Sequence, residues 1–368
     1  MRRARVGDFD AEMIQRLLDF ALRQRLFILA ATLALIVAGI HAYISVPIEA
    51  YPDVGDAQVQ VITQWAGHAS EEVERQITLP IERAMNTAPH QNSVRSVSIA
   101  GLSVVTVTFA EGTGDYFARQ QALERLANVA LPDGVNPGLG PLASPIAEIM
   151  RYQIVSCRER PVAECSDDDK KSEAKSLSEL KDLEEWVVER ELLRADGVAD
   201  VASFGGTVKQ YQVLLSASLL AERGLTLDDV QGALSEANGN GGGGVIALGP
   251  EALNVRAMGL LTPSQIADVA VATHHGVPVR VRDIGVVQVG YRVRLGRVSV
   301  DQDKDVVAAV ILLRRGDDAQ AVLERVHEHI FELNSRILPR GVKLHPYQDR
   351  SQLMELTTHT VLENLSAG

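Results

Sequence analysis

The sequence has few of the residues that mark disulfide scaffolds, aromatic-rich cores or nucleic-acid surfaces. Only two of its 368 residues are cysteines, and aromatic residues make up 4%. The 36 Lys and Arg are outnumbered by 48 Asp and Glu, which gives a formal net charge of −12. Because a nucleic-acid backbone is bound through clustered basic residues, this balance argues against a nucleic-acid partner. An acidic surface is typical of a soluble region, and it also attracts cations.

The short motifs of common enzyme classes are also missing. No Gly-x-Ser-x-Gly or His-Glu-x-x-His occurs. The glycine run Asn238–Gly244 lacks the Lys and Ser or Thr of a phosphate-binding loop, and we interpret it as a flexible turn. The pair His274-His275 is a weak metal candidate. His327 and His329 alternate on a predicted helix and so point in different directions. Nothing here indicates an enzyme.

The two cysteines, Cys157 and Cys165, lie close together in a polar, charged stretch, and we expect 158–175 to be a mobile loop. If this stretch lies outside the cytoplasm, the pair fits a local disulfide. It fits equally well two free thiols in a loop. Neither cysteine has a His or Cys partner at a spacing typical of zinc sites.

Long hydrophobic runs are scarce, with one exception. Leu26–Val46 holds no Asp, Glu, Lys or Arg, and it reaches the roughly 20 apolar residues that a bilayer span needs. Arg23 and Arg25 precede it, so the positive-inside rule places the N-terminus in the cytoplasm and the bulk of the chain outside. A signal peptide has a shorter apolar core, and a buried core helix is the other alternative. The run predicts a transmembrane helix after a short amphipathic segment.

The chain beyond this run alternates predicted strands and helices in a repeated order. The first repeat is β-α-β-β-α with a closing strand, and its second helix stops before Leu131–Val135. The second repeat opens its first helix with a capping box, Ser176–Glu179, and its second helix ends at Leu338–Val342 with the same Leu-Pro-x-Gly-Val pattern. An insertion, Gly205–Gly290, interrupts it and contains a helix capped by Thr226.

The predicted elements follow from period-two or helical spacing of apolar residues. In the first repeat the predicted strands are Val59–Thr63, Val94–Ile99 and Val104–Phe109. Its first helix is capped by Ser70, buries Val73, Ile77 and Ile81, and is kinked at Pro80. Its second helix spans Tyr116–Ala130. In the second repeat the predicted elements are strands Ile149–Val155, Val198–Phe204 and Val306–Leu313, a helix with Leu180, Leu183 and Val187 on one face, and strands Tyr211–Leu215, Val279–Val281 and Val286–Val289 in the insertion.

Five ordered segments carry a family pattern: IEAYPDVGDAQVQV (Ile48–Val61), VQVITQWAGHASEEVERQITLPIE (Val59–Glu82), DVASFGGTVKQYQV (Asp200–Val213), GVPVRVRDIGVVQVG (Gly276–Gly290) and YQDRS (Tyr347–Ser351). They resemble the heavy-metal subgroup of resistance-nodulation-division (RND) efflux permeases, the CzcA/CusA type. The resemblance covers nearly the whole chain from about Arg16. It implies proton-driven export of heavy-metal cations by a homotrimer in the bacterial inner membrane, with a periplasmic adaptor and an outer-membrane channel as partners.

The predicted fold is an α+β membrane protein with one N-terminal transmembrane helix and two ferredoxin-like βαββαβ subdomains. The resemblance makes these two periplasmic pore subdomains and makes the insertion a docking subdomain. We expect the chain to be an N-terminal portion that ends before the second membrane helix and is inactive alone. The expected parts are a cytoplasmic segment (1–25), the membrane helix (26–46), the first pore subdomain (47–143), the second (144–204 and 293–347), the docking subdomain (205–292) and a helix leading to the membrane (348–368).

Two acids are singled out by the resemblance as metal ligands. Zinc-type members have an acid after a Gly-Pro stretch, which here reads GPLASPIAEIM and gives Glu148; a second acid precedes a Trp, which here reads LEEW and gives Glu185 in place of Asp. No resident cofactor is expected, and the cargo is a divalent metal ion such as zinc. Two alternatives stay open: a membrane-anchored periplasmic metal-binding or interaction module without transport, and a fragment of a drug-exporting RND permease.

Overall fold

The computed structural model describes residues 23–45, 55–143, 146–239, 241–248, 251–257, 259, 261–274, 276–294 and 296–367. Most of the predicted cytoplasmic segment and His275 lie outside these ranges. The chain divides into two compact units. The smaller contains the helices α2 (Arg25–Ser45) and α12 (Ser351–Ala367), and the larger contains the sheets.

The predicted membrane segment is the helix α2, which begins one residue earlier than expected. Among the described residues it is the one helix long and apolar enough to cross a membrane. Its side chains, such as Leu29, Leu33 and Ile36, are largely exposed. An apolar helix that exposes its surface is suited to a lipid surrounding, where all its backbone hydrogen bonds stay internal.

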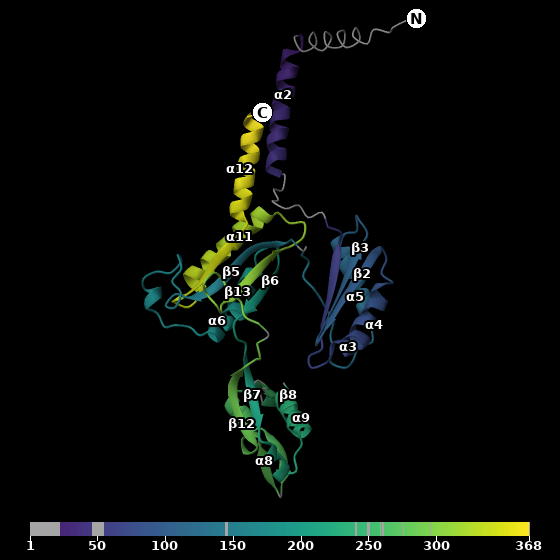
Figure 1. Cartoon of the computed structure of the whole chain (residues 1–368), viewed down its shortest axis with the longest axis vertical. Helices are drawn as coiled ribbons and strands as arrows, with labels where there is room; N and C mark the ends of the chain where they lie inside the picture. The colour runs from purple at the N-terminus through teal and green to yellow at the C-terminus, as the bar shows by residue number, and fades with distance from the viewer. Residues whose placement is uncertain are drawn as a thin grey trace. The chain divides into compact units, whose positions relative to one another are not determined.

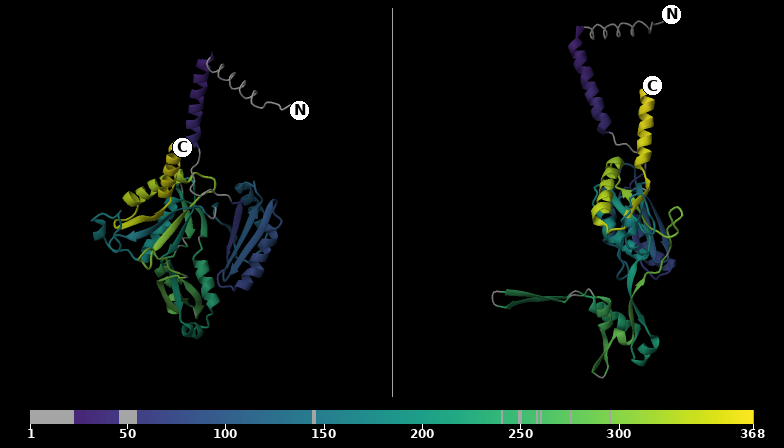
Figure 2. Two further views of the ribbon diagram at one scale, coloured as in Figure 1. Left: turned by 45° about the horizontal axis from the view of Figure 1, so that its top comes forward. Right: turned by 90° about the vertical axis from the view of Figure 1, so that its left-hand side faces the viewer.

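The first repeat forms a four-stranded antiparallel sheet with strand order β2-β3-β1-β4. This is the order of a ferredoxin-like βαββαβ unit. Both helical segments lie on one face of the sheet, in blue in Figure 1 and Figure 2. The elements are β1 (Gln58–Gln64), α3 (Ser70–Val73), η1 (Glu74–Thr78), α4 (Leu79–Met85), β2 (Gln91–Ile99), β3 (Leu102–Phe109), α5 (Asp115–Leu126) and β4 (Gly138–Leu139).

The core of this unit follows the predicted periodicities. Val59 and Val61 of β1 are buried while the residues between them are not, because successive side chains of a strand face opposite sides. Val73, Ile77 and Ile81 are fully buried, as the helical spacing predicted. Each such side chain contributes roughly 1.5–3 kcal/mol by leaving water, before the loss of chain entropy is counted.

The start of the first helix differs from the sequence prediction, and a π-helical turn precedes its proline. Ala69, not Ser70, is the N-cap residue, and its backbone N–H donates to the Glu72 carboxylate at 3.1 Å. Pro80 stands at the second position of α4, directly after the π-helical turn η1. Proline has no N–H, so the helix lacks one backbone hydrogen bond here. The wider π-helical turn before Pro80 accommodates that missing hydrogen bond.

The second repeat has the same connectivity, with strand order β14-β5-β13-β6. The repeat predicted from the sequence is therefore present, and the insertion separates β6 from β13; the residue boundaries of the subdomains stay predictions. The elements are β5 (Glu148–Ser156), α6 (Leu177–Leu183), η3 (Glu184–Val188), α7 (Glu189–Leu192), β6 (Val198–Gly205), β13 (Val307–Leu313), α11 (Ala319–Glu332), η5 (Leu333–Ile337) and β14 (Val342–Asp349).

The insertion consists of short helices and two-stranded sheets, in which β12 pairs with β7, β10 with β11 and β8 with β9. Thr226 caps α9 as predicted. The glycine run was predicted to be a turn, and this is wrong: most of it is strand β8, because pairing with β9 overrides the low strand propensity of glycine. The elements are β7 (Lys209–Leu215), α8 (Ala217–Glu222), α9 (Leu227–Ala237), β8 (Gly241–Leu248), β9 (Glu251–Ala257), α10 (Pro263–Asp268), β10 (Ala270–His274), β11 (Val277–Arg280), η4 (Val281–Asp283) and β12 (Gly285–Tyr291).

The polar stretch after Cys157, which we expected to be a mobile loop, is linked to its surroundings by a disulfide and by hydrogen bonds to a buried carboxylate. Cys157 and Cys165 form a disulfide, which decides between the two alternatives. Asp169 is buried, and its carboxylate accepts hydrogen bonds from the Ser166 hydroxyl at 2.8 Å and the Gly341 N–H at 3.0 Å. Gly341 has φ +80°, and a Cβ there would lie 1.6 Å from the Ser172 hydroxyl. The contact with Gly341 comes from a residue distant in sequence, so the loop's own composition did not reveal it.

The hydrogen bond from Ser166, together with those from the Gly341 and Ser166 N–H groups, lowers the pKa of Asp169 from 3.8 to about 2, although burial opposes the shift. A group with a depressed folded-state pKa stabilises the fold above its unfolded-state pKa and loses this effect as the pH falls through the folded value. We expect Asp169→Asn to lower the free energy of unfolding at pH 7 by about 2 kcal/mol. The difference from wild type should shrink as the pH falls from about 4 toward 2.

Denaturant unfolding of the full chain in detergent micelles, at several pH values, measures this difference. Asp167→Asn is the control, because the Asp167 side chain is 90% exposed and forms a surface ion pair with Lys170. A deficit in Asp169→Asn that does not change with pH would show that the substitution acts by shape and not by charge.

Candidate functional site

Glu148, the first predicted metal ligand, is the first residue of β5. Its carboxylate accepts two hydrogen bonds from the Arg151 guanidinium, one of them from Nη2 to Oε2 at 2.9 Å. The glutamate side chain is 26% exposed. The hydrogen bond to Glu148 raises the pKa of Arg151. Opposite Glu148 the β5–β13 register shifts between Ile311 and Leu312, so the acid lies where the ladder becomes irregular.

A tyrosine from the YQDRS segment lies near this ion pair. The β14–β5 register shifts between Pro346 and Gln348, which leaves Tyr347 as the extra residue of a bulge. Bulges turn a side chain away from the regular alternation of a strand. Burial raises the pKa of Tyr347, the Arg151 charge opposes this and the Glu148 charge adds to it. One acid, one guanidinium and one phenol therefore gather at this end of the second sheet.

Glu185, the second predicted ligand, lies in η3 and is 34% exposed. Lys181, one turn earlier, places its Nζ 3.2 Å from Glu185 Oε1. The neighbouring Trp186 is exposed, and the guanidinium of Arg190 lies over its ring at 4.6 Å. Each predicted ligand thus has a basic partner of its own, and the two acids occupy separate ion pairs on β5 and η3.

Glu184, the residue before Glu185, is completely buried, and the sequence interpretation missed it. The Tyr152 hydroxyl donates to Glu184 Oε1 at 3.0 Å, and Lys181 Nζ lies 3.8 Å from its other oxygen. Burial raises the pKa of Glu184, and hydrogen bonding to Ser203 and the Lys181 charge oppose the shift. Burial also raises the pKa of Tyr152 well above its usual value.

The buried stripe of this helix explains the omission. Leu180, Glu184 and Val188 are buried, whereas Leu183 and Val187, which the sequence assigned to the core with Leu180, are half-buried. The π-helical turn η3 holds one residue more per turn than an α-helix does and so shifts the inward face. The four-residue spacing from Leu180 to Glu184, which places both residues on one helix face, was the sequence signal that Glu184 is buried.

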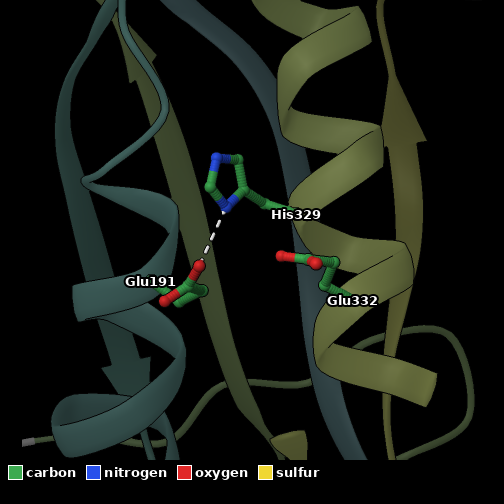
Figure 3. Close-up of side chains that lie close together, drawn as sticks. All are labelled: Glu191, His329 and Glu332. Carbon is green, nitrogen blue, oxygen red and sulfur yellow. Dashed lines mark hydrogen bonds and ion pairs between the residues drawn. The ribbon is translucent and has the colours of Figure 1, made fainter. Parts of the chain in front are cut away.

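A third group of acids and histidine lies between α7 and α11 (Figure 3). Ligand atoms of Glu191, His329 and Glu332 all fall within 4.8 Å of one another, and His329 Nδ1 is 3.1 Å from Glu191 Oε1. His327 instead lies 2.7 Å from Asp349, so the two histidines point apart as predicted. The sequence signal for the group was the i,i+3 spacing of His329 and Glu332.

Comparison with known proteins gives a consistent result. Residues 17–368 match the family model described as the AcrB/AcrD/AcrF family. The chain is 36% identical to the cobalt-zinc-cadmium resistance protein CzcA of Cupriavidus metallidurans, over 97% of this chain and 33% of CzcA. It is 35% identical to the cation efflux system protein CusA of Escherichia coli, over 96% of this chain and 32% of CusA, and 35% identical to the protein HelA of Legionella pneumophila, over 97% of this chain and 33% of HelA.

A solved structure agrees in fold as well as in sequence. The crystal structure of a heavy metal efflux pump superimposes with a TM-score of 0.83 at 36% identity, covering 95% of this chain and 34% of the pump. The chain spans about a third of the length of the relatives it matches. The family model covers nearly all of the chain, and CzcA and CusA are named as metal resistance and cation efflux proteins. This chain therefore belongs to the AcrB/AcrD/AcrF family, in its CzcA/CusA-like heavy-metal efflux branch.

Proposed function

We propose that the chain is the N-terminal portion of a proton-driven permease that exports heavy-metal cations through a tripartite complex. The observation that carries this proposal is its 36% identity to a cobalt-zinc-cadmium resistance protein over 97% of the chain. The apolar helix α2 would anchor it in the inner membrane with its N-terminus in the cytoplasm, because Arg23 and Arg25 lie at the N-terminal end of its apolar run. Both sheets would then lie in the periplasm, where the Cys157–Cys165 disulfide is stable.

The insertion is suited to contact with other proteins of such a complex. Its β7–β12 pair is a two-stranded sheet, and Tyr211, Val289 and Tyr291, which share one face of it, are more than half exposed. Exposed apolar side chains grouped on one element are typical of interaction surfaces. The proposed partners are a periplasmic adaptor and an outer-membrane channel, and the proposed assembly is a homotrimer.

The proposed metal ligands are Glu148 and Glu185, whose carboxylate oxygens suit divalent cations such as zinc. Arg151 and Lys181 now neutralise these acids. A divalent ion would have to displace both basic side chains, and this competition weakens metal binding. A transport site gains from such weakening, because it must also release its cargo.

The alternatives are a metal-binding or interaction module without transport and an exporter of organic drugs. The names of the relatives, which describe cation efflux and resistance to cobalt, zinc and cadmium, favour metal over organic cargo. Deleting the gene in its native host separates export from binding alone. If the protein exports metal, the deletion strain should tolerate less zinc, cobalt or cadmium and should contain more of that metal. Unchanged tolerance and metal content would favour the binding or interaction module without transport.

Replacing both proposed ligands should weaken metal binding by the isolated chain. We expect Glu148→Gln with Glu185→Gln to raise the Kd for Zn²⁺ at least about 100-fold, since even outer-shell changes around metal sites weaken binding by roughly 10–100-fold. Calorimetric titration of the full chain in micelles measures this. Asp182→Asn is the matched control, because Asp182 lies on α6, is 35% exposed and pairs with Lys209. Equal zinc affinity in the double variant and the control would remove these residues from the site.

Removing the competing ammonium should have the opposite effect. Lys181→Met keeps the apolar stem of the side chain, so we expect zinc to bind about threefold to tenfold more tightly as Glu185 loses its ion pair. Lys209→Met, which frees Asp182 instead, should leave the affinity unchanged. Weaker binding in Lys181→Met would mean that the lysine supports the site and does not compete with the metal.

A further inference from the structure

The group Glu191, His329 and Glu332 has the geometry of a chelate formed by two helices. His329 and Glu332 lie one turn apart on α11 and project toward Glu191 of α7, as Figure 3 shows. One nitrogen and two carboxylate oxygens lie within 4.8 Å of one another. Donors that bind one ion at 2.0–2.2 Å must approach each other to about 3–4 Å, so small rotamer changes bring these three to a common centre.

The surroundings leave room for the remaining ligands of an ion. A surface hollow of about 710 Å³ is lined by His329, Glu332 and their neighbours on α11 and η5. Glu191 and His329 are only 15% and 24% exposed, so their positions are held by packing, while the hollow stays open to water. Metal sites with three protein ligands complete their coordination with water or another small ligand from such a side.

Both carboxylates of the group already pair with cationic side chains. Glu191 pairs with Arg194 at 3.0 Å and Glu332 with Arg336 at 3.3 Å. Both arginines are more than 70% exposed, so they can swing into solvent when an ion binds.

We propose that Glu191, His329 and Glu332 form a second divalent-cation site, separate from Glu148 and Glu185, that takes borderline ions such as Zn²⁺, Co²⁺ or Ni²⁺. One imidazole and two carboxylates are donors that these ions accept. The ion would join α7, which precedes the insertion in sequence, to α11, which follows it. A bound ion would therefore hold together the two helices that cover the second sheet, one before and one after the insertion in sequence.

The test is metal binding by the full chain, freed of metal with a chelator in detergent micelles and titrated with Co²⁺ and Zn²⁺. Wild type should bind, besides any ion at Glu148 and Glu185, a further ion whose cobalt absorption disappears in His329→Ala, and zinc should shift the His329 imidazole NMR signals of wild type. Glu332→Gln, at a half-exposed position that folding tolerates, should weaken the same ion at least tenfold. His327→Ala is the matched control, because His327 lies on the same helix and lines the same hollow but faces Asp349.

The Glu148→Gln, Glu185→Gln double variant should keep this ion, which separates failure of the second site from failure of the proposed transport ligands. If His329→Ala and Glu332→Gln bind cobalt and zinc as wild type does, the second site is refuted. If His327→Ala lowers the affinity as much as His329→Ala does, the ion is held elsewhere in the hollow and the assignment is wrong.

Discussion

A buried carboxylate, Glu184, constrains the architecture of the second ferredoxin-like unit. A glutamate with no exposed surface must receive hydrogen bonds or a positive charge, because burying an unpartnered charge costs several kcal/mol. Tyr152 of β5 supplies the hydrogen bond, and Lys181 of α6 supplies the charge. These contacts fix the helix on the sheet in one register, since a rotation of the helix would leave Glu184 and Tyr152 without partners. Glu185, the next residue, is thereby directed toward the solvent-facing side.

The two ferredoxin-like units share a second device, a π-helical turn in the helix after the first strand. In the first unit η1 precedes Pro80, and in the second η3 holds Glu184 and Glu185. A π-helical turn costs stability, and such turns are found mostly where a particular side chain must be aimed. In the first unit proline accounts for the turn. In the second no proline is present in the helix, and the turn places one acid inward and the next outward.

Local chemistry made most of the fold predictable from the sequence. Alternation in Val59–Thr63 and the capping boxes at Ser176 and Thr226 are encoded within a few residues, and they gave the strands and helix starts correctly. Some failures were local, such as the Ser70 cap and the inward face of the helix after Ser176, and other features depend on distant partners. The strand β8 needs β9, and the loop after Cys157 needs Gly341. At the sites, the family pattern named Glu148 and Glu185 and gave no hint of the arginine and lysine that pair with them.

The paired cations bear on how a carboxylate site can release metal. A cluster of bare acids would hold a divalent ion tightly and also repel itself when empty. Arg151 pairs with Glu148 and Lys181 pairs with Glu185, so both carboxylates are neutralised when no metal is bound. The binding free energy of an ion would then be only the difference between its attraction to the carboxylates and that of the basic side chains it displaces. Lys181 is nearly buried and also faces Glu184, so on leaving Glu185 it keeps a second carboxylate within reach. If Glu185 binds metal as proposed, displacement of Lys181 by the ion and its return after release would be movements of one side chain between two neighbouring acids.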